Sequence, residues 1–274
     1  MSKRASFASR AAASPYIVWA ALFIIAPLIF VVYYSFTNAS GDFTLIYIQT
    51  LPKYLPTFLR SIWFGIVATI ICLLIAFPLA YIISQKSDKA QRTFVLLVML
   101  PMWMSFLIRT YSWIALLQDT GIINSFLNKL GIDSVHMINT GGAVILGMVY
   151  NFLPYMILPI YSVMAKLDYS MVEACQDLGG NTFNVIRRCI IPMSLPGVVS
   201  GITMVFVPSV STFYISQKLG GGSFDLIGDV IERQFQQSYN YNLGASLSLV
   251  LMVLIVISMA IMNHFSEGEG EMVI

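Results

Sequence analysis

The sequence predicts an all-α membrane protein with six transmembrane helices. Of its 274 residues, 58% are hydrophobic and only 10% are charged, whereas soluble domains carry roughly 25% charged residues. Apolar runs of about twenty residues, the length that crosses a bilayer core, recur evenly along the chain. No polar segment between them is long enough to fold alone. We therefore expect one membrane domain over 15–262, with tails at 1–14 and 263–274.

The first predicted span covers about 15–36. It follows a basic segment without acidic residues and ends in aromatic residues. A signal peptide would have a shorter apolar core and a small-residue cleavage site. The run therefore predicts an uncleaved first transmembrane helix.

Five further spans are predicted, at about 61–83, 93–117, 143–164, 195–215 and 243–262. Prolines lie inside several of them: Pro78, Pro101, Pro154, Pro159 and Pro208. Each proline leaves a helical carbonyl without its donor. A packing kink explains any single one, but five together favour a bundle that moves around a pathway.

The basic residues predict the orientation of the chain. Six spans place both termini on one side of the membrane, and with that side inside, the inner segments hold nine Lys and Arg against five in the outer loops. Positive residues are enriched in cytoplasmic loops. We therefore expect both termini, and the polar stretch 170–198, to be cytoplasmic. The net charge of +2 is too small to indicate nucleic-acid binding.

The polar stretch 170–198 is expected to begin with a short helix over Met171–Leu178. Ser170 and Glu173 have the spacing of a capping box, in which each side chain bonds the other's backbone amide. Gly179 and Gly180 would end this helix, because glycine adopts the left-handed C-cap conformation easily.

A second short helix is expected after Asn181, which can cap it. Pro192 and Pro196 are predicted to separate this helix from the fifth span. Capping alone explains Glu173, but two well-formed helices at the cytoplasmic face also suit docking of a soluble partner. No Walker A pattern occurs in the sequence, so a nucleotide-driven process would need another subunit.

Arg109 is the one charge well inside a predicted span. It lies eight residues before the end of the third span, roughly 12 Å along a straight helix. A charge at the bilayer centre costs roughly 2.5–3.5 kcal/mol on insertion scales, which makes it a functional candidate. The alternatives are snorkelling or a structural pair with Asp119 or with the carboxyl end of a helix.

Aromatic and amide side chains in the predicted spans suit an organic cation. These residues are Trp103, Tyr150, Asn151, Tyr155 and Tyr214. Ordinary packing, and the aromatic belt for Tyr214, explain them equally well. No paired carboxylates lie within a span, so a proton or sodium relay has no evident parts.

The three cysteines, Cys72, Cys175 and Cys189, show neither CxxC nor His–Cys spacing. This argues against a metal site and against a disulfide framework. We expect them to be small buried residues.

The polar stretch resembles the EAA motif of ABC-importer permeases, E-A-A-x3-G-x9-I-x-L-P. The match runs through Glu173-Ala174-Cys175, Gly179 and Cys189-Ile190-Ile191-Pro192. It departs from the motif at Cys175 for alanine, Cys189 for isoleucine and Ile191 for leucine. The stretch also lies between the fourth and fifth of six spans, where the family has it.

Over the whole chain the sequence is similar to the first permease subunit of spermidine/putrescine importers. The similarity is carried by 100–117, 149–168 and 213–235, and Asp229 stands where related sequences often have Asn. The resemblance implies the type I ABC-importer permease fold, with cytoplasmic coupling helices between helices 4 and 5. It implies a second permease, two copies of an ATPase that holds ATP and Mg, and an extracytoplasmic polyamine-binding protein as partners. This chain itself would bind no cofactor or metal and would not be an enzyme.

Two sets of site residues are expected, the first from the resemblance and the second mainly from residue types within the predicted spans. The ATPase-coupling set is Glu173, Ala174, Asp177, Gly179, Gly180 and Pro192. The substrate-pathway set is Trp103, Arg109, Tyr150, Asn151, Tyr155, Tyr214, Asp225 and Asp229.

Three alternatives stay open. A permease of the same type could carry another solute, such as ferric iron, thiamine, sulfate or phosphonate. A secondary transporter would need membrane-embedded acids and usually more spans. A structural scaffold would leave the span prolines and the EAA-like stretch unexplained.

Overall fold

Helices make up all the regular elements that the computed structural model describes, in residues 15–167, 169–177, 181–222 and 224–270. Within these ranges five helices are long and apolar enough to cross a membrane, or six if a bent pair of helices counts as one span. The predicted all-α fold class is therefore confirmed. The N-terminal tail, 1–14, lies outside the described residues.

The chain divides into two compact units, residues 1–55 with 230–253 and residues 56–229 with 254–274. The first unit contains the apolar helix Pro15–Ser35. Its elements are η1 (Ala21–Ile25), α2 (Ala26–Ser35), α3 (Ile46–Thr50), η2 (Leu51–Tyr54), most of α13 (Ile227–Gln236) and the first part of α14 (Tyr241–Gly270).

Hydrogen bonds from α14 hold the end of α2 within this first unit. The Asn242 amide donates to the carbonyl oxygens of Thr37, at 2.7 Å, and Tyr34, at 3.2 Å. The Ser246 hydroxyl donates to the Ser35 carbonyl at 3.2 Å. The last turn of a helix has carbonyls without internal partners, and α14 supplies donors to them.

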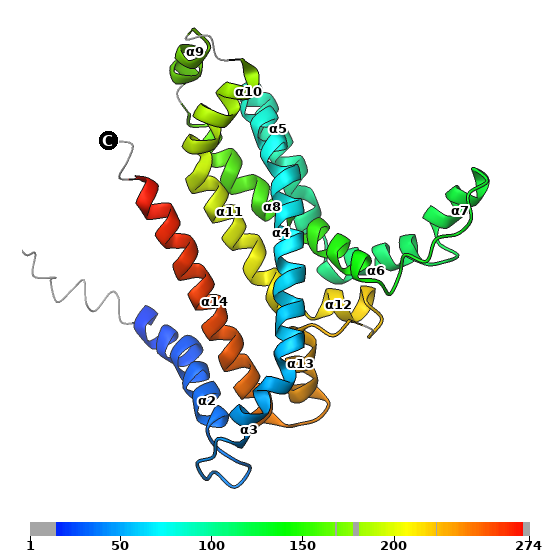
Figure 1. The fold of residues 1–274 in the computed structure, drawn as a ribbon, viewed down its shortest axis with the longest axis vertical. Coiled ribbons are helices and arrows are strands. Elements are labelled where there is room, and N and C mark those ends of the chain that lie inside the picture. The colour runs from blue at the N-terminus through cyan, green and yellow to red at the C-terminus, as the bar shows by residue number, and fades with distance from the viewer. Residues whose placement is uncertain (1–14, 168, 178–180, 223, 271–274) are drawn as a thin grey trace, which may run out of the picture. The chain divides into compact units, whose positions relative to one another are not determined.

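The second unit contains the remaining elements (Figure 1). They are α4 (Leu55–Ser84), α5 (Asp88–Met99), η3 (Leu100–Trp103), α6 (Phe106–Leu117), α7 (Ile122–Lys129), α8 (Gly141–Met164), α9 (Tyr169–Asp177), α10 (Thr182–Val185), η4 (Ile186–Ile190), α11 (Ile191–Ser211), α12 (Tyr214–Leu219), the start of α13 and the end of α14.

The third predicted span, 93–117, is not one straight helix. The helical stretches Asp88–Trp103 and Phe106–Lys129 meet at 87°, and Figure 1 shows α5 and α6 running in different directions. Between them Met104 and Ser105 take extended conformations, three residues after Pro101 interrupts the hydrogen-bond ladder. Arg109 lies after the bend, and the eight residues that follow it to Leu117 belong to the single helix α6.

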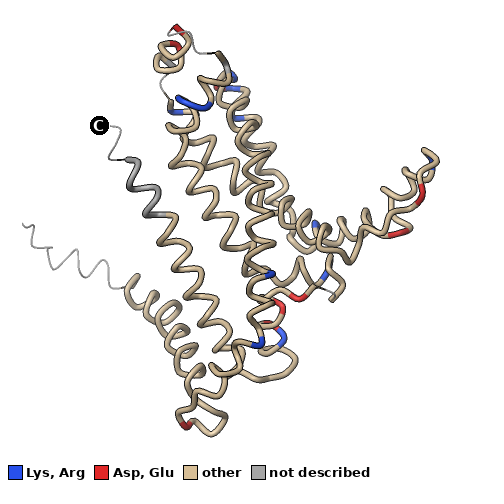
Figure 2. Tube along the Cα trace, viewed as in Figure 1, with Lys and Arg blue, Asp and Glu red and all other residues tan. Residues whose placement is uncertain are grey.

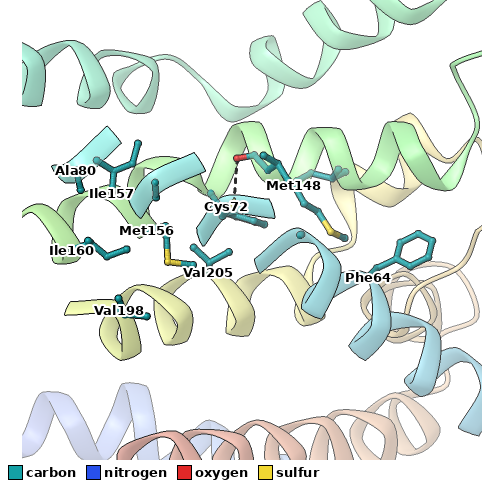
Figure 3. Packing of buried hydrophobic residues seen from close by; sticks show 14 of the residues in the cluster. Phe64, Cys72, Ala80, Met148, Met156, Ile157, Ile160, Val198 and Val205 are labelled. Atoms are coloured by element: carbon teal, nitrogen blue, oxygen red, sulfur yellow. Dashed lines mark hydrogen bonds between the residues drawn. The ribbon is translucent and has the colours of Figure 1, made fainter. Parts of the chain in front are cut away.

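The core of the second unit lies where α8 packs against α11, with α4 beside α8 (Figure 3). Met156 and Ile160 of α8 and Val205 of α11 are fully buried there. The helix α4 contributes a row of small residues to the core, Ala68, Cys72, Ala76 and Ala80. Small residues let helices in a membrane approach closely.

Two glycines of α11 bring α8 and α11 into close contact. A Cβ added at Gly197 would lie 2.8 Å from the Pro159 carbonyl oxygen and 3.1 Å from the Ile160 Cα. A Cβ at Gly201 would lie 2.7 Å from the Met156 sulfur. The obstruction at Gly197 is backbone, which cannot move aside as the end of a methionine side chain can.

We predict that Gly197→Ala lowers the free energy of unfolding. Overpacking in a tight core costs about 1–3 kcal/mol, which outweighs the gain in helix propensity of about 1 kcal/mol. Thermal unfolding of the purified chain in detergent measures the effect.

The matched control is Gly142→Ala in α8, where the nearest atom to the new Cβ is Thr140 Oγ1 at 3.7 Å. This variant should be as stable as the wild type or more so. Equal stability of all three proteins would show that α8 and α11 do not meet at Gly197.

Candidate docking segment and solute pathway

Residues 169–190, here called the docking segment, form two short helical pieces in the second unit. The helix α9 begins at Tyr169, so Ser170 lies within its first turn. The predicted capping box would instead place Ser170 just before the first turn. The expected cap of the second piece is confirmed, since the Asn184 amide donates to Asn181 Oδ1 at 2.9 Å. Gly179 and Gly180, the predicted elbow between the pieces, lie outside the described residues.

The predicted separation of the docking segment from the fifth span is wrong. The helix runs without interruption from Phe183 to Ser211, through Pro192 at the start of α11. Just before the proline, η4 is a π-helical turn, in which the Ile191 amide donates to the carbonyl of Ile186, five residues back. This wider turn changes the local hydrogen-bond ladder where Pro192 offers no donor. The second half of the docking segment is therefore a direct extension of α11.

The coupling residues that the structure describes are accessible. Glu173, Ala174 and Asp177 are exposed on α9, and Pro192 is exposed on α11. Figure 2 shows acidic and basic residues gathered around α9, α10 and the start of α5, at one end of the long helices of this unit. Beneath them, Val172, Val185 and Ile190 belong to the hydrophobic core. The segment thus has a buried apolar side and an exposed charged side, as a docking surface requires.

Arg109 lies on α6 and is only 9% exposed. Its guanidinium carbon lies 5.8 Å from the centre of the Phe106 ring. Nε and Nη1 are buried and have no hydrogen-bond partner among the described residues. The predicted structural pair with Asp119 is not formed, because that carboxylate binds His136 at 2.9 Å. Arg109 is therefore a buried cation for whose Nε and Nη1 the described residues supply no acceptor.

A second incomplete polar group lies near the same helix pair. Asn151 is 3% exposed, and its amide nitrogen donates to the Gly147 carbonyl at 2.8 Å, but its Oδ1 has no partner among the described residues. The neighbouring Tyr150 meets Trp113 of α6 edge-on, with ring centres 5.4 Å apart. Arg109 precedes Trp113 by one helical turn. Arg109, with its buried donors, and Asn151, with its buried acceptor, thus lie near the ring contact between α6 and α8 in sequence.

Tyr214 begins α12 and does not end the fifth span, because α11 stops at Ser211. Its ring lies 5.7 Å from that of Phe106. The Lys218 ammonium lies 5.8 Å from the centre of the Tyr214 ring and 5.9 Å from that of Tyr111. Sequence reasoning missed Lys218, because Tyr111 and Tyr214 meet only when α6 packs against α12.

Trp103 and Tyr155 do not join these groups in a closed site. The Trp103 side chain is 71% exposed, immediately before the bend between α5 and α6. Tyr155 is exposed on α8 and contacts Phe152 with ring centres 6.5 Å apart. Both positions are surfaces that another chain or lipid can cover.

Asp229 is held by hydrogen bonds within the folded chain. It is buried, Oδ1 accepts a hydrogen bond from the Ser216 hydroxyl at 2.9 Å, and Oδ2 accepts one from the Leu226 amide at 2.7 Å. The latter is the backward contact of a helix cap at the start of α13. The Ile227 amide next to it donates to Ser61 Oγ of α4 at 2.7 Å. Sequence reasoning missed Ser61 and Ser216, because neither has a local pattern.

Asp225 lies two residues before α13 and is half-buried. It also makes an interaction within the chain. The two acids expected in the pathway therefore both have partners in the folded chain.

The described residues form apolar helices, a surface-exposed charged segment and a few buried polar groups. This combination suits a membrane transport permease. The chain belongs to the family described as binding-protein-dependent transport system inner membrane component, which matches residues 7–268.

The curated relatives agree with the family. The chain is 38% identical over 232 residues to the spermidine/putrescine transport system permease protein PotB of Haemophilus influenzae, covering 81% of each chain. It is 33% identical over 227 residues to PotB of Escherichia coli K12, covering 79% of this chain and 82% of that one. The expected resemblance to this group of permeases is confirmed.

Solved structures show the same fold. A bacterial ABC transporter involved in alginate import matches with a TM-score of 0.76 at 19% identity, over 94% of each chain. The alginate transporter in complex with an alginate-bound periplasmic protein matches with a TM-score of 0.75 at 18% identity. The predicted ABC-importer permease fold is therefore confirmed.

We predict that replacing Arg109 by methionine stabilises the isolated chain. Leaving a buried polar group unsatisfied costs about 1–3 kcal/mol, and more for a charge, so Arg109→Met should raise the free energy of unfolding by at least about 1 kcal/mol. Unfolding of the purified chain in detergent measures this change.

Arg60→Met serves as the control, because Arg60 is an exposed arginine on α4. Its effect should stay within about 0.5 kcal/mol. A marked loss of stability in Arg109→Met alone would mean that the guanidinium finds acceptors within the isolated chain.

Proposed function

We propose that the chain is a membrane-spanning permease subunit of an ATP-driven importer of polyamines such as spermidine and putrescine. The observation that carries this proposal is the similarity to PotB permeases along four fifths of the chain, at up to 38% identity among the relatives compared. The chain itself is not an enzyme in this proposal, because ATP and Mg are bound by a separate ATPase subunit.

The contact between α6 and α12 supports a cationic substrate. The Lys218 side chain ends in a primary ammonium group, and it lies over the rings of Tyr111 and Tyr214. A polyamine ends in the same chemical group, which binds aromatic faces by electrostatic attraction to the ring. The structure thus contains, in its own lysine, an example of the contact that a polyamine would make.

The docking segment would bind the ATPase at the cytoplasmic face, where both termini also lie. Glu173, Ala174 and Asp177 would form the exposed contact on α9, with Gly179 and Gly180 as the elbow and Pro192 at the junction with α11. Movement of the ATPase would pass directly along the helix Phe183–Ser211, because this helix is continuous. A second permease, two ATPases and a binding protein outside the membrane would complete the transporter.

The pathway would run beside α6, α8 and α12. Trp103, Tyr150, Asn151, Tyr155 and Tyr214 would offer aromatic faces and amide oxygens to the substrate, whereas Asp225 and Asp229 would act through the position of α13. Arg109 would not face a cationic substrate directly, since like charges repel.

A permease for an anionic solute is the second candidate. It is favoured by Arg109, whose buried Nε and Nη1 have no acceptor among the described residues. Sulfate or a phosphonate would supply acceptors to such cations. Uptake measurements separate the two candidates.

We predict that cells lacking this chain lose uptake of radiolabelled spermidine and regain it when the chain is restored. Unlabelled putrescine should compete with the label, whereas sulfate, a phosphonate and thiamine should not. Unchanged spermidine uptake in the deletion strain, or competition by sulfate or the phosphonate, would overturn the polyamine assignment.

Two substitutions at one position refine this test. Tyr214→Leu removes the ring and should raise the KM for spermidine about two- to fivefold, which corresponds to the 0.5–1 kcal/mol typical of an exposed cation–π contact. Tyr214→Phe keeps the ring face and should behave like the wild type. If Tyr214→Leu and Tyr214→Phe both keep the wild-type KM, Tyr214 does not belong to the pathway.

A further inference from the structure

Two of the three departures from the EAA motif are cysteines, and folding brings them together. Cys175, which replaces the second alanine, lies on α9, and Cys189, which replaces the isoleucine, lies on η4. Fourteen positions separate them in the sequence, so their spacing gave no sign of a pair.

The contact between α9 and η4 brings the Cys189 thiol to the turn of α9 that ends at Cys175. Cys189 Sγ lies 3.8 Å from the Met171 carbonyl oxygen. On a helix that carbonyl points along the axis toward the residue four positions later, which is Cys175. The side chain of Cys175 is close enough to interact with the Cys189 thiol.

Of the two thiols, that of Cys175 is the one more accessible to an oxidant. Cys175 is partly exposed, whereas Cys189 is only 5% exposed and lies 3.8 Å from the Met193 sulfur. Both cysteines are free thiols in this structure. A small oxidant can therefore reach Cys175 first, with Cys189 held next to it as the resolving thiol.

We propose that Cys175 and Cys189 form a reversible intramolecular disulfide that locks α9 to the helix Phe183–Ser211. The oxidant is a peroxide. The Cys175 thiolate attacks one peroxide oxygen, the O–O bond breaks, and a sulfenic acid forms with release of water. The Cys189 sulfur then attacks the Cys175 sulfur and displaces the sulfenic oxygen as a second water. Two thiols are oxidised to one disulfide, and one hydrogen peroxide is reduced to two waters.

The lock changes the part of the chain that carries the docking surface. With free thiols, the contacts that join α9 to η4 in the described residues are non-covalent, as between the Cys189 thiol and the Met171 carbonyl. A disulfide fixes the distance between the two helices. This functional consequence rests on the proposed docking role of α9, whereas formation of the disulfide does not.

The chemical test uses the complete transporter in membrane vesicles from its host. Vesicles are treated with hydrogen peroxide, free thiols are alkylated under denaturing conditions, and peptides are identified by mass spectrometry. We expect a linked peptide pair containing Cys175 and Cys189, while Cys72, which is fully buried in the core, stays alkylated. Dithiothreitol should return both thiols.

Two variants that restore the family residues serve as matched controls. Cys175→Ala and Cys189→Ile should fold normally and should each abolish the linked peptide. Independent alkylation of both cysteines in the oxidised wild type, or a link between copies of the chain, would overturn the disulfide.

The functional test measures spermidine uptake by the same vesicles. Peroxide should reduce uptake in the wild type, dithiothreitol should restore it, and the double variant should be unaffected. If the disulfide forms and uptake is unchanged, the lock has no role in transport. If the vesicles never take up spermidine but the disulfide forms, the proposed substrate is wrong and the modification site stands.

Discussion

The continuous helix from Phe183 to Ser211 is the constraint on which the second unit depends. It begins inside the docking segment, passes Pro192 by way of the π-helical turn η4, and then packs along α8. At Gly197 and Gly201 the absence of a side chain lets the two helices touch backbone to backbone and backbone to side chain. Because interiors are close-packed and deform little, a push on the docking segment would be transmitted to α8.

The incomplete polar groups lie on α8 and on α6, which contacts α8. Among the described residues, Nε and Nη1 of Arg109 on α6 have no acceptor, and Oδ1 of Asn151 on α8 has no donor. Charged or polar groups at membrane depth usually face a pathway or a partner. In the proposed transporter, movement of the α8–α11 pair would open or close a route beside Arg109 and Asn151.

Sequence reasoning reached the helical fold, the Asn181 cap and the EAA-like segment, because each has a local signal in hydropathy, residue type or spacing. It wrongly placed a break at Pro192, since a π-helical turn that tolerates proline has no such signal. It predicted a straight helix for the third span, because the extended conformations of Met104 and Ser105 occur inside an apolar run. The Ser216–Asp229 bond and the Cys175–Cys189 pair join distant segments, and only the fold reveals them.

The central claim is that the docking segment couples an ATPase to the helix Phe183–Ser211, and Glu173→Lys tests it most directly. Glu173 is exposed, so reversing its charge leaves folding intact while disturbing the docking surface. The measurement is spermidine imported per ATP hydrolysed by the assembled transporter, with Asp133→Lys, at another exposed acid, as control. The account predicts that Glu173→Lys keeps ATP hydrolysis but loses import, whereas Asp133→Lys keeps both. Wild-type import per ATP in Glu173→Lys would contradict it.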